Sequence, residues 1–140
     1  MNEAVLVPEQ KPPGFSVLVL DMYHYMDPEE EETVAGFATI ELAREYAKRR
    51  TRDSLEQQRP GNTTPQAIRS SWFMFGEDCL VIGGSYSGCD ELDYFISHPA
   101  TDEERDWVSL TPDPELRRLL QSVADIRPNQ STKDESERNA

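Results

Sequence analysis

The residues best suited to chemistry gather in one short segment, DMYHYMDPEEEE, at positions 21–32. Asp21, His24 and Asp27 follow one another at intervals of three residues, and Tyr25 lies between the last two. Carboxylates and an imidazole in this order could work as acid–base groups or hold a metal ion. In a β-strand, however, residues three apart point to opposite faces, so a local site requires the strand to end or bulge near residue 24.

The competing interpretation of this segment is a strand whose tyrosines and methionines pack, with His24 hydrogen-bonded at its rim. A metal site needs three or four converging ligands, and the chain contains two histidines in all. The packed strand is therefore favoured, and neither a metal nor another cofactor is predicted. Asp21 would share a face with Val17 and Val19, where an unpaired carboxylate is costly, so we expect it to have a partner.

A second acidic pair, Glu77 and Asp78, follows the predicted end of a helix, where negative charge gains nothing from the helix dipole. A solvated turn is the commoner explanation, although the placement also suits a functional pair. Combined with the first segment, the pair gives one hypothesis for function, a small-ligand- or metal-dependent enzyme. That hypothesis requires one pocket to contain the following side chains: Asp21, His24, Tyr25, Asp27, Glu77 and Asp78.

Basic residues are concentrated on one predicted helix, because six of the fourteen fall between Arg44 and Arg59. Arg44, Lys48 and Arg52 stand four residues apart, which predicts a positive stripe along the helix. Such a stripe is usually a solvated face. It could also bind an acidic partner, a phosphate-bearing ligand, or the acidic loop of residues 29–32 in a second copy.

Composition and the other motifs narrow the classes of function. The net charge of −13 argues against a membrane or nucleic-acid binder and favours solubility or a basic partner. The glycine-rich GGSYSG at positions 83–88 is neither a P-loop nor a nucleophile elbow, since Tyr86 stands where a serine would be required. Cys79 and Cys89 lack metal-site spacing, and no leader or long apolar run is evident, so a cytoplasmic, reduced protein is expected.

The hydrophobic pattern of the first half predicts a strand at residues 15–26 that is central and covered on both faces, the second cover being another helix or a second copy. A return strand is predicted at residues 33–38. A helix capped by Thr39 should run to about Gln58, burying Leu42, Ala43, Tyr46, Ala47 and Leu55. A second helix should start at Thr64 and end at Gly76, with Ile68, Trp72 and Phe75 pointing inward.

In the second half, the sequence predicts a strand at residues 79–83, a helical turn or two at 90–96, a strand at 107–110 and a final helix from Asp113. The final helix has leucines and a valine at helical spacing. Residues 1–13 are expected to be a flexible arm and residues 127–140 a disordered tail, leaving one domain at residues 14–126. The predicted fold class is α+β, a small mostly antiparallel sheet packed with three to four helices.

Several of these segments resemble a family of short, uncharacterised bacterial proteins. The matching stretches are VLVLDMYHYMD (17–27), GFAT (36–39) followed by ELA, RDSL (52–55) and FGED (75–78). The resemblance covers about residues 15–96, and the chain departs from the pattern after FGED, where Cys79 and Leu80 replace Pro-Phe. It implies a shared fold and assigns no functional residue.

The function that the sequence favours is a non-catalytic protein-interaction or regulatory module that binds a protein partner or itself, with a homodimer as one form. The enzyme described above is the alternative. A lesser alternative is an acidic mimic of nucleic acid that binds a basic protein, which would need regularly spaced carboxylates on one face. Direct nucleic-acid binding by the chain is not expected.

Overall fold

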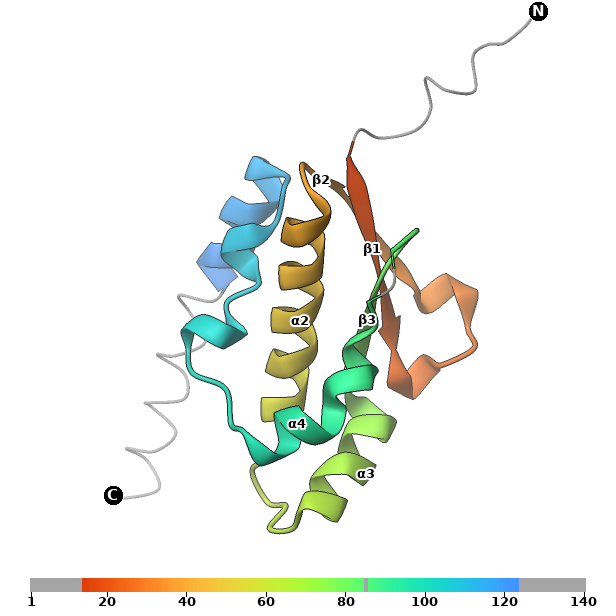
Figure 1. The fold of residues 1–140 in the computed structure, drawn as a ribbon, viewed down its shortest axis with the longest axis vertical. Helices are drawn as coiled ribbons and strands as arrows, with labels where there is room; N and C mark the ends of the chain where they lie inside the picture. The colour runs from red at the N-terminus through yellow and green to blue at the C-terminus, as the bar shows by residue number, and fades with distance from the viewer. Residues whose placement is uncertain (1–13, 85, 124–140) are drawn as a thin grey trace, which may run out of the picture.

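The apolar run at residues 15–21 forms the central strand of a three-stranded antiparallel sheet (Figure 1). The computed structural model describes residues 14–84 and 86–123. β1 (Phe15–Asp21) pairs on one side with β2 (Glu32–Phe37) and on the other with β3 (Glu77–Val81). The predicted α+β class, the central position of β1 and its hairpin with the return strand are confirmed.

One face of this sheet is covered by α2 (Ile40–Glu56). Thr39 caps the helix by accepting a hydrogen bond from the backbone N–H of Leu42 at 3.1 Å, as the sequence predicts. The buried cluster between helix and sheet comprises Val17, Val19, Val34, Phe37, Ala43, Tyr46, Ala47, Cys79 and Val81. Leu42 was expected in this cluster, but it lies on the exposed side of the first turn.

The opposite face of the sheet is covered less well. Leu18, Leu20 and Leu80 are half-buried there, and Ile82 is exposed. In Figure 1 the described helices lie beside and below the sheet on the α2 side, and the loop of residues 22–31 extends on the other side. The expected second covering helix is therefore not found within the described residues, and cover by a second copy stays a prediction.

A second buried cluster lies at the lower end of α2 in Figure 1, where α3 (Pro65–Phe75) and α4 (Leu92–Ser97) meet it. Trp72 fills its centre and donates from Nε1 to Ser54 Oγ at 2.9 Å. Thr64 and Gly76 bound α3 as predicted. Phe75 was expected inward but is 53% exposed, because Trp72 already occupies the buried position and the Phe75 ring turns outward to stack on Tyr23.

The second half of the chain agrees with the sequence prediction in part. β3 begins at Glu77, two residues earlier than predicted. Residues 108–110 form a 3-10 turn, so the predicted strand there is wrong. Residues 114–123 are helical as predicted, although several of their apolar side chains are exposed. The predicted N-terminal arm and C-terminal tail lie outside the described residues. Within the described part of the chain, no helix is long and apolar enough to cross a membrane.

Candidate functional site

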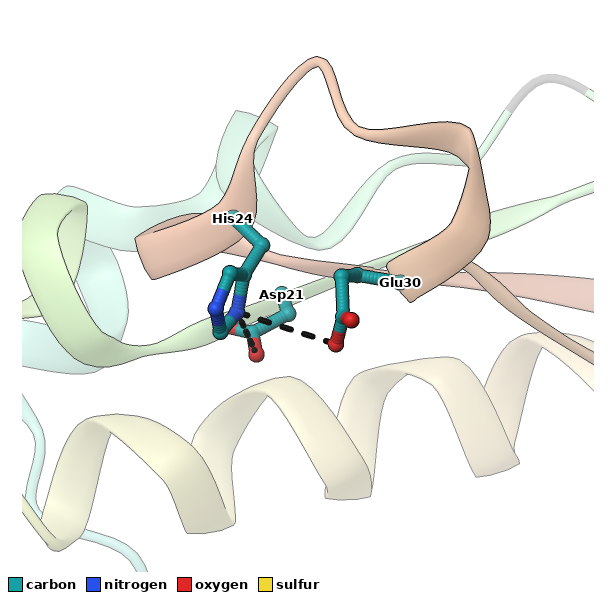
Figure 2. Close-up of side chains that lie close together, drawn as sticks. All are labelled: Asp21, His24 and Glu30. Carbon is teal, nitrogen blue, oxygen red and sulfur yellow. Dashed lines mark hydrogen bonds and ion pairs between the residues drawn. The ribbon is translucent and has the colours of Figure 1, made fainter.

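The strand β1 ends at Asp21, and this early end brings three polar side chains together. Asp21 caps the following 3-10 turn (Met22–His24), because its Oδ1 accepts the backbone N–H of Tyr23 at 3.0 Å. The turn carries His24 back, so that its Nδ1 lies 3.0 Å from Asp21 Oδ2 and 3.8 Å from Glu30 Oε1 (Figure 2). The strand end that a local site required is present, and Asp21 has the partner expected for it.

Glu30, rather than Asp27, completes this group. Asp27 begins a second 3-10 turn (Pro28–Glu30), and its Oδ1 accepts the backbone N–H of Glu29 at 3.1 Å. That turn directs Glu30 towards His24 and leaves Asp27 as a cap. The hydrogen bond to Asp21, with a smaller contribution from the charge of Glu30, raises the pKa of His24 above 6.5. Of the Asp21–His24–Asp27 set that was the less favoured interpretation, the structure brings Asp21 and His24 together and leaves Asp27 outside. The favoured interpretation, a packed strand to residue 26, is wrong beyond Asp21, because Tyr23, Tyr25 and Met26 are exposed.

The acidic pair Glu77–Asp78 is divided between the two sides of β3. Asp21 and Glu77 are direct partners across the β1–β3 ladder, so both side chains lie on the α2 side of the sheet. Asp78 pairs with Leu20 and points the other way, where it accepts the backbone N–H of Cys89 at 3.0 Å. Because the pair belongs to a strand, the predicted solvated turn is wrong, and Glu77 alone of the two approaches Asp21.

Arg50, which the sequence did not single out, holds this end of the sheet to α2. Its guanidinium lies 3.1 Å from Glu77 Oε1 and 3.0 Å from Glu32 Oε1, and it donates to the Tyr46 hydroxyl at 2.7 Å. It also stacks over the Trp107 ring, 4.4 Å from the centroid. The signal in the sequence was weak, because Arg50 is one of several basic residues on α2 and its partners come from two distant strands.

A surface cavity of about 440 Å³ opens beside these groups. Its lining combines carboxylates with two aromatic rings: Asp21, Arg50, Asp53, Ser54, Gln57, Phe75, Glu77 and Trp107. Asp53 is already engaged, since it accepts from Arg105 Nε at 2.8 Å and from Trp107 Nε1 at 3.0 Å. The enzyme hypothesis required six side chains in one pocket. This cavity is lined by Asp21 and Glu77, and the other four do not line it: His24, Tyr25, Asp27 and Asp78.

The predicted positive stripe on α2 is interrupted. Arg44 is exposed, and Lys48 is ion-paired with Glu91, with 4.0 Å between Lys48 Nζ and Glu91 Oε1. Arg52 is only 4% exposed; it donates to the His98 carbonyl and lies with its guanidinium 4.8 Å from the centre of the Phe95 ring. The prediction of three exposed cations is wrong at Arg52, because α4 packs against the second half of α2.

A group of large apolar side chains is exposed next to the Asp21–His24–Glu30 group. Tyr23, Tyr25 and Met26 belong to the loop after β1, and Phe73, Met74 and Phe75 to the last turn of α3. The two segments meet where the rings of Tyr23 and Phe75 stack, with centroids 5.8 Å apart and planes 18° from parallel. We call these six residues the aromatic surface. Of them, the sequence had singled out Tyr25 alone as a site residue, because apolar residues in a strand pattern are read as core.

Comparison with known proteins finds no family model, no curated protein and no solved structure that matches this chain. The family resemblance seen in the sequence stays a prediction. Function must be argued from the geometry described above.

Proposed function

We propose that the protein is a non-catalytic interaction module, and that the aromatic surface binds a basic, partly apolar segment of another protein. The observation that carries this proposal is the stacked pair Tyr23–Phe75, whose side chains are 66% and 53% exposed where the two segments of the aromatic surface meet.

Exposure on this scale is costly unless a partner covers it. Contiguous apolar patches on soluble proteins commonly mark interaction sites, and aromatic residues and methionine are enriched in the centres of interfaces. Tyrosine in particular supplies contact area with few rotatable bonds and often carries much of the binding energy. The aromatic surface consists of these residue types and includes no Leu, Ile or Val.

The charge around the aromatic surface supports a basic partner. Between Asp21 and Glu32 the sequence has six carboxylates and no lysine or arginine. On α3, which carries the other half of the aromatic surface, the Arg69 guanidinium lies over the Phe73 ring but is paired with Asp93 at 2.6 Å. Such a field attracts cations and repels anions during encounter, so it favours a partner in which lysines or arginines flank apolar anchors.

The other hypotheses from the sequence have less support. A docking stripe for an acidic partner loses Arg52, which is buried. The enzyme hypothesis loses Asp27 and Asp78 from its constellation. The nucleic-acid mimic needs free carboxylates in a regular array, whereas Glu32 and Glu77 are both ion-paired with Arg50.

Self-association and cellular location belong to the same proposal. A homodimer would cover the half-buried outer face of the sheet or the aromatic surface, but two copies of a chain with a net charge of −13 repel each other. We therefore rank a heterologous partner first. The free thiols of Cys79 and Cys89 support a reducing compartment, which is the cytoplasm in this proposal.

The experiment that tests the proposal is photo-crosslinking in the living host, with a benzophenone amino acid at Tyr23. The matched control has the same amino acid at Tyr94, which is 53% exposed on α4. We expect position 23 to give an adduct that position 94 does not give. Mass spectrometry should identify the captured segment as one with net positive charge and apolar residues, and Phe75→Asp should abolish the adduct.

Two results would overturn the proposal. A captured segment with net negative charge would contradict the electrostatic argument. An adduct between two copies of this chain would assign the aromatic surface to a homodimer instead of to a basic partner.

A further inference from the structure

We propose that Asp21, His24 and Glu30 bind one divalent transition-metal ion of the zinc type. One nitrogen and two oxygen donors converge here: His24 Nδ1, Asp21 Oδ2 and Glu30 Oε1, all within 4.8 Å of one another (Figure 2). The proposal does not depend on the partner discussed above, because none of the three donor residues belongs to the aromatic surface.

The spacing of the donor atoms matches a coordination sphere. Zinc bonds to imidazole nitrogen and carboxylate oxygen are about 2.0–2.2 Å long, so neighbouring ligand atoms are separated by about 3.0–3.4 Å in octahedral or tetrahedral geometry. His24 Nδ1 and Asp21 Oδ2 are already 3.0 Å apart. Glu30 Oε1, which lies 3.8 Å from His24 Nδ1 and within 4.8 Å of the Asp21 donor atom, has to approach both, and its half-exposed side chain permits this.

The backbone holds two of the donors before any ion arrives. Asp21 is fixed by the β1 ladder, and its second oxygen is occupied by the N–H of Tyr23, which leaves Oδ2 directed at His24. The His24 ring is further held edge-on against Tyr23, with centroids 4.9 Å apart. A ligand set that is already ordered loses less conformational entropy on binding.

The surroundings provide room and a favourable field for the ion. The cavity of about 440 Å³ lined by Asp21 and Glu77 opens beside the group, so water can complete the coordination as in zinc sites with three protein ligands. Arg50 lines the same cavity, and its guanidinium is paired with Glu32 and Glu77 and not with Asp21 or Glu30. The carboxylates of Asp21 and Glu30 therefore retain their charge for an ion.

The mixed donor set determines the class of ion. An imidazole with two carboxylates suits Zn²⁺ and its first-row neighbours, whereas Mg²⁺ prefers an all-oxygen sphere and keeps most of its waters. A bound ion would tie the end of β1 to the turn before β2 and so fix the loop that carries Tyr23, Tyr25 and Met26.

The test is calorimetric titration of the full chain with zinc chloride near neutral pH, with circular dichroism as the check that each variant folds. We expect one ion per chain, saturating below millimolar concentration and unaffected by excess Mg²⁺. His24→Ala and Glu30→Ala should each weaken binding at least tenfold, since each removes a direct ligand.

Two matched variants make the result specific. His98→Ala removes the other histidine, which follows α4 as its C-cap residue and is not part of the donor group, and should leave the affinity unchanged. Asp27→Asn retains the cap of the second 3-10 turn and should also leave it unchanged, which separates Glu30 from Asp27 as the ligand. The proposal is overturned if zinc binding does not saturate, if it survives His24→Ala, or if Asp27→Asn weakens it as much as Glu30→Ala does.

Discussion

Replacing Arg50 with methionine should destabilise the protein more than any other loss of a single charge on α2. The Arg50 side chain is buried against Tyr46 and Trp107, and it pairs with one carboxylate from β2 and one from β3. Methionine has a similar apolar stem, so the substitution removes the guanidinium while largely preserving the packing.

The loss in the free energy of unfolding depends on the polar groups that lose their partner when the Arg50 guanidinium is removed. Removing one partner of a buried ion pair costs about 3–5 kcal/mol, because the other partner stays desolvated. The side chains of Glu32 and Glu77 are 50% and 36% exposed, so water can solvate them after the change. This reduces their share to about 1–2 kcal/mol, and the buried Tyr46 hydroxyl, which loses its partner, adds about 1 kcal/mol. We expect a loss of about 2–3 kcal/mol in the free energy of unfolding.

Urea denaturation followed by tryptophan fluorescence measures this loss. With a slope of about 1.5 kcal/mol per molar urea, the midpoint should fall by about 1.3–2 M. Arg44→Met, on the exposed side of the same helix, is the control and should change stability by less than about 0.5 kcal/mol. Adding Glu77→Gln to Arg50→Met should recover part of the loss, because it removes an unpaired carboxylate. Equal midpoints for Arg50→Met and Arg44→Met would refute the reasoning.

Three further predictions concern the buried elements around the site. A thiol reagent should label Cys89 in the folded protein and leave Cys79 unlabelled, because burial raises the pKa of the Cys79 thiol to about 12 and closes access to it; rapid labelling of both thiols would contradict this. Burial raises the pKa of Asp78 above 3.8, so the protonated carboxyl favours the folded state and this contribution is lost as the pH rises through the raised pKa. In urea denaturation, Asp78→Asn should therefore gain stability relative to wild type between mildly acid and neutral pH. A stability difference that stays constant with pH would exclude this cause. Gly76→Ala should cost about 1–3 kcal/mol in the same assay, because the new methyl group would overlap the Trp72 ring, and an unchanged midpoint would show that the ring moves freely.

Local sequence signals predicted the helix boundaries and the central strand of the fold well. Thr39 and Thr64 begin their helices as the capping rule predicts, because capping depends on a few neighbouring residues. Gly76 ends α3 where predicted, although its backbone is extended and not left-handed. The central position of β1 also followed from a run of residues that is apolar on both faces. These features are fixed within one segment, so one sequence is enough to find them.

The site was harder to predict because it depends on register and on turns. The pairing of Asp21 with Glu77 follows from the alignment of two strands more than fifty residues apart, and β3 itself begins earlier than its apolar run. The polar group contains Glu30 and not Asp27, because the Asp27 side chain accepts the backbone N–H of Glu29 and caps the second 3-10 turn. The spacing of apolar residues along the chain predicts neither the pairing of Asp21 with Glu77 nor the approach of Glu30 to His24.

Exposure was the quantity that the sequence predicted least well. Arg52 was expected in a solvated stripe and is buried under α4, whereas Phe75 was expected in the core and lies on the surface. Arg52 is buried because α4 packs against this part of α2, whereas no described helix packs over Phe75 on α3. Hydrophobicity identifies which residues can be buried, but the tertiary arrangement determines which of them are.

The central claim, that the aromatic surface binds a basic segment, is tested most directly by measuring the affinity of the segment captured at Tyr23 for purified protein variants. We expect Phe75→Asp to weaken binding at least tenfold and Tyr94→Asp to leave it unchanged, and we expect the affinity of the wild type to fall as salt is raised. Equal affinities for the Phe75→Asp and Tyr94→Asp variants, or an affinity that does not respond to salt, would contradict the account.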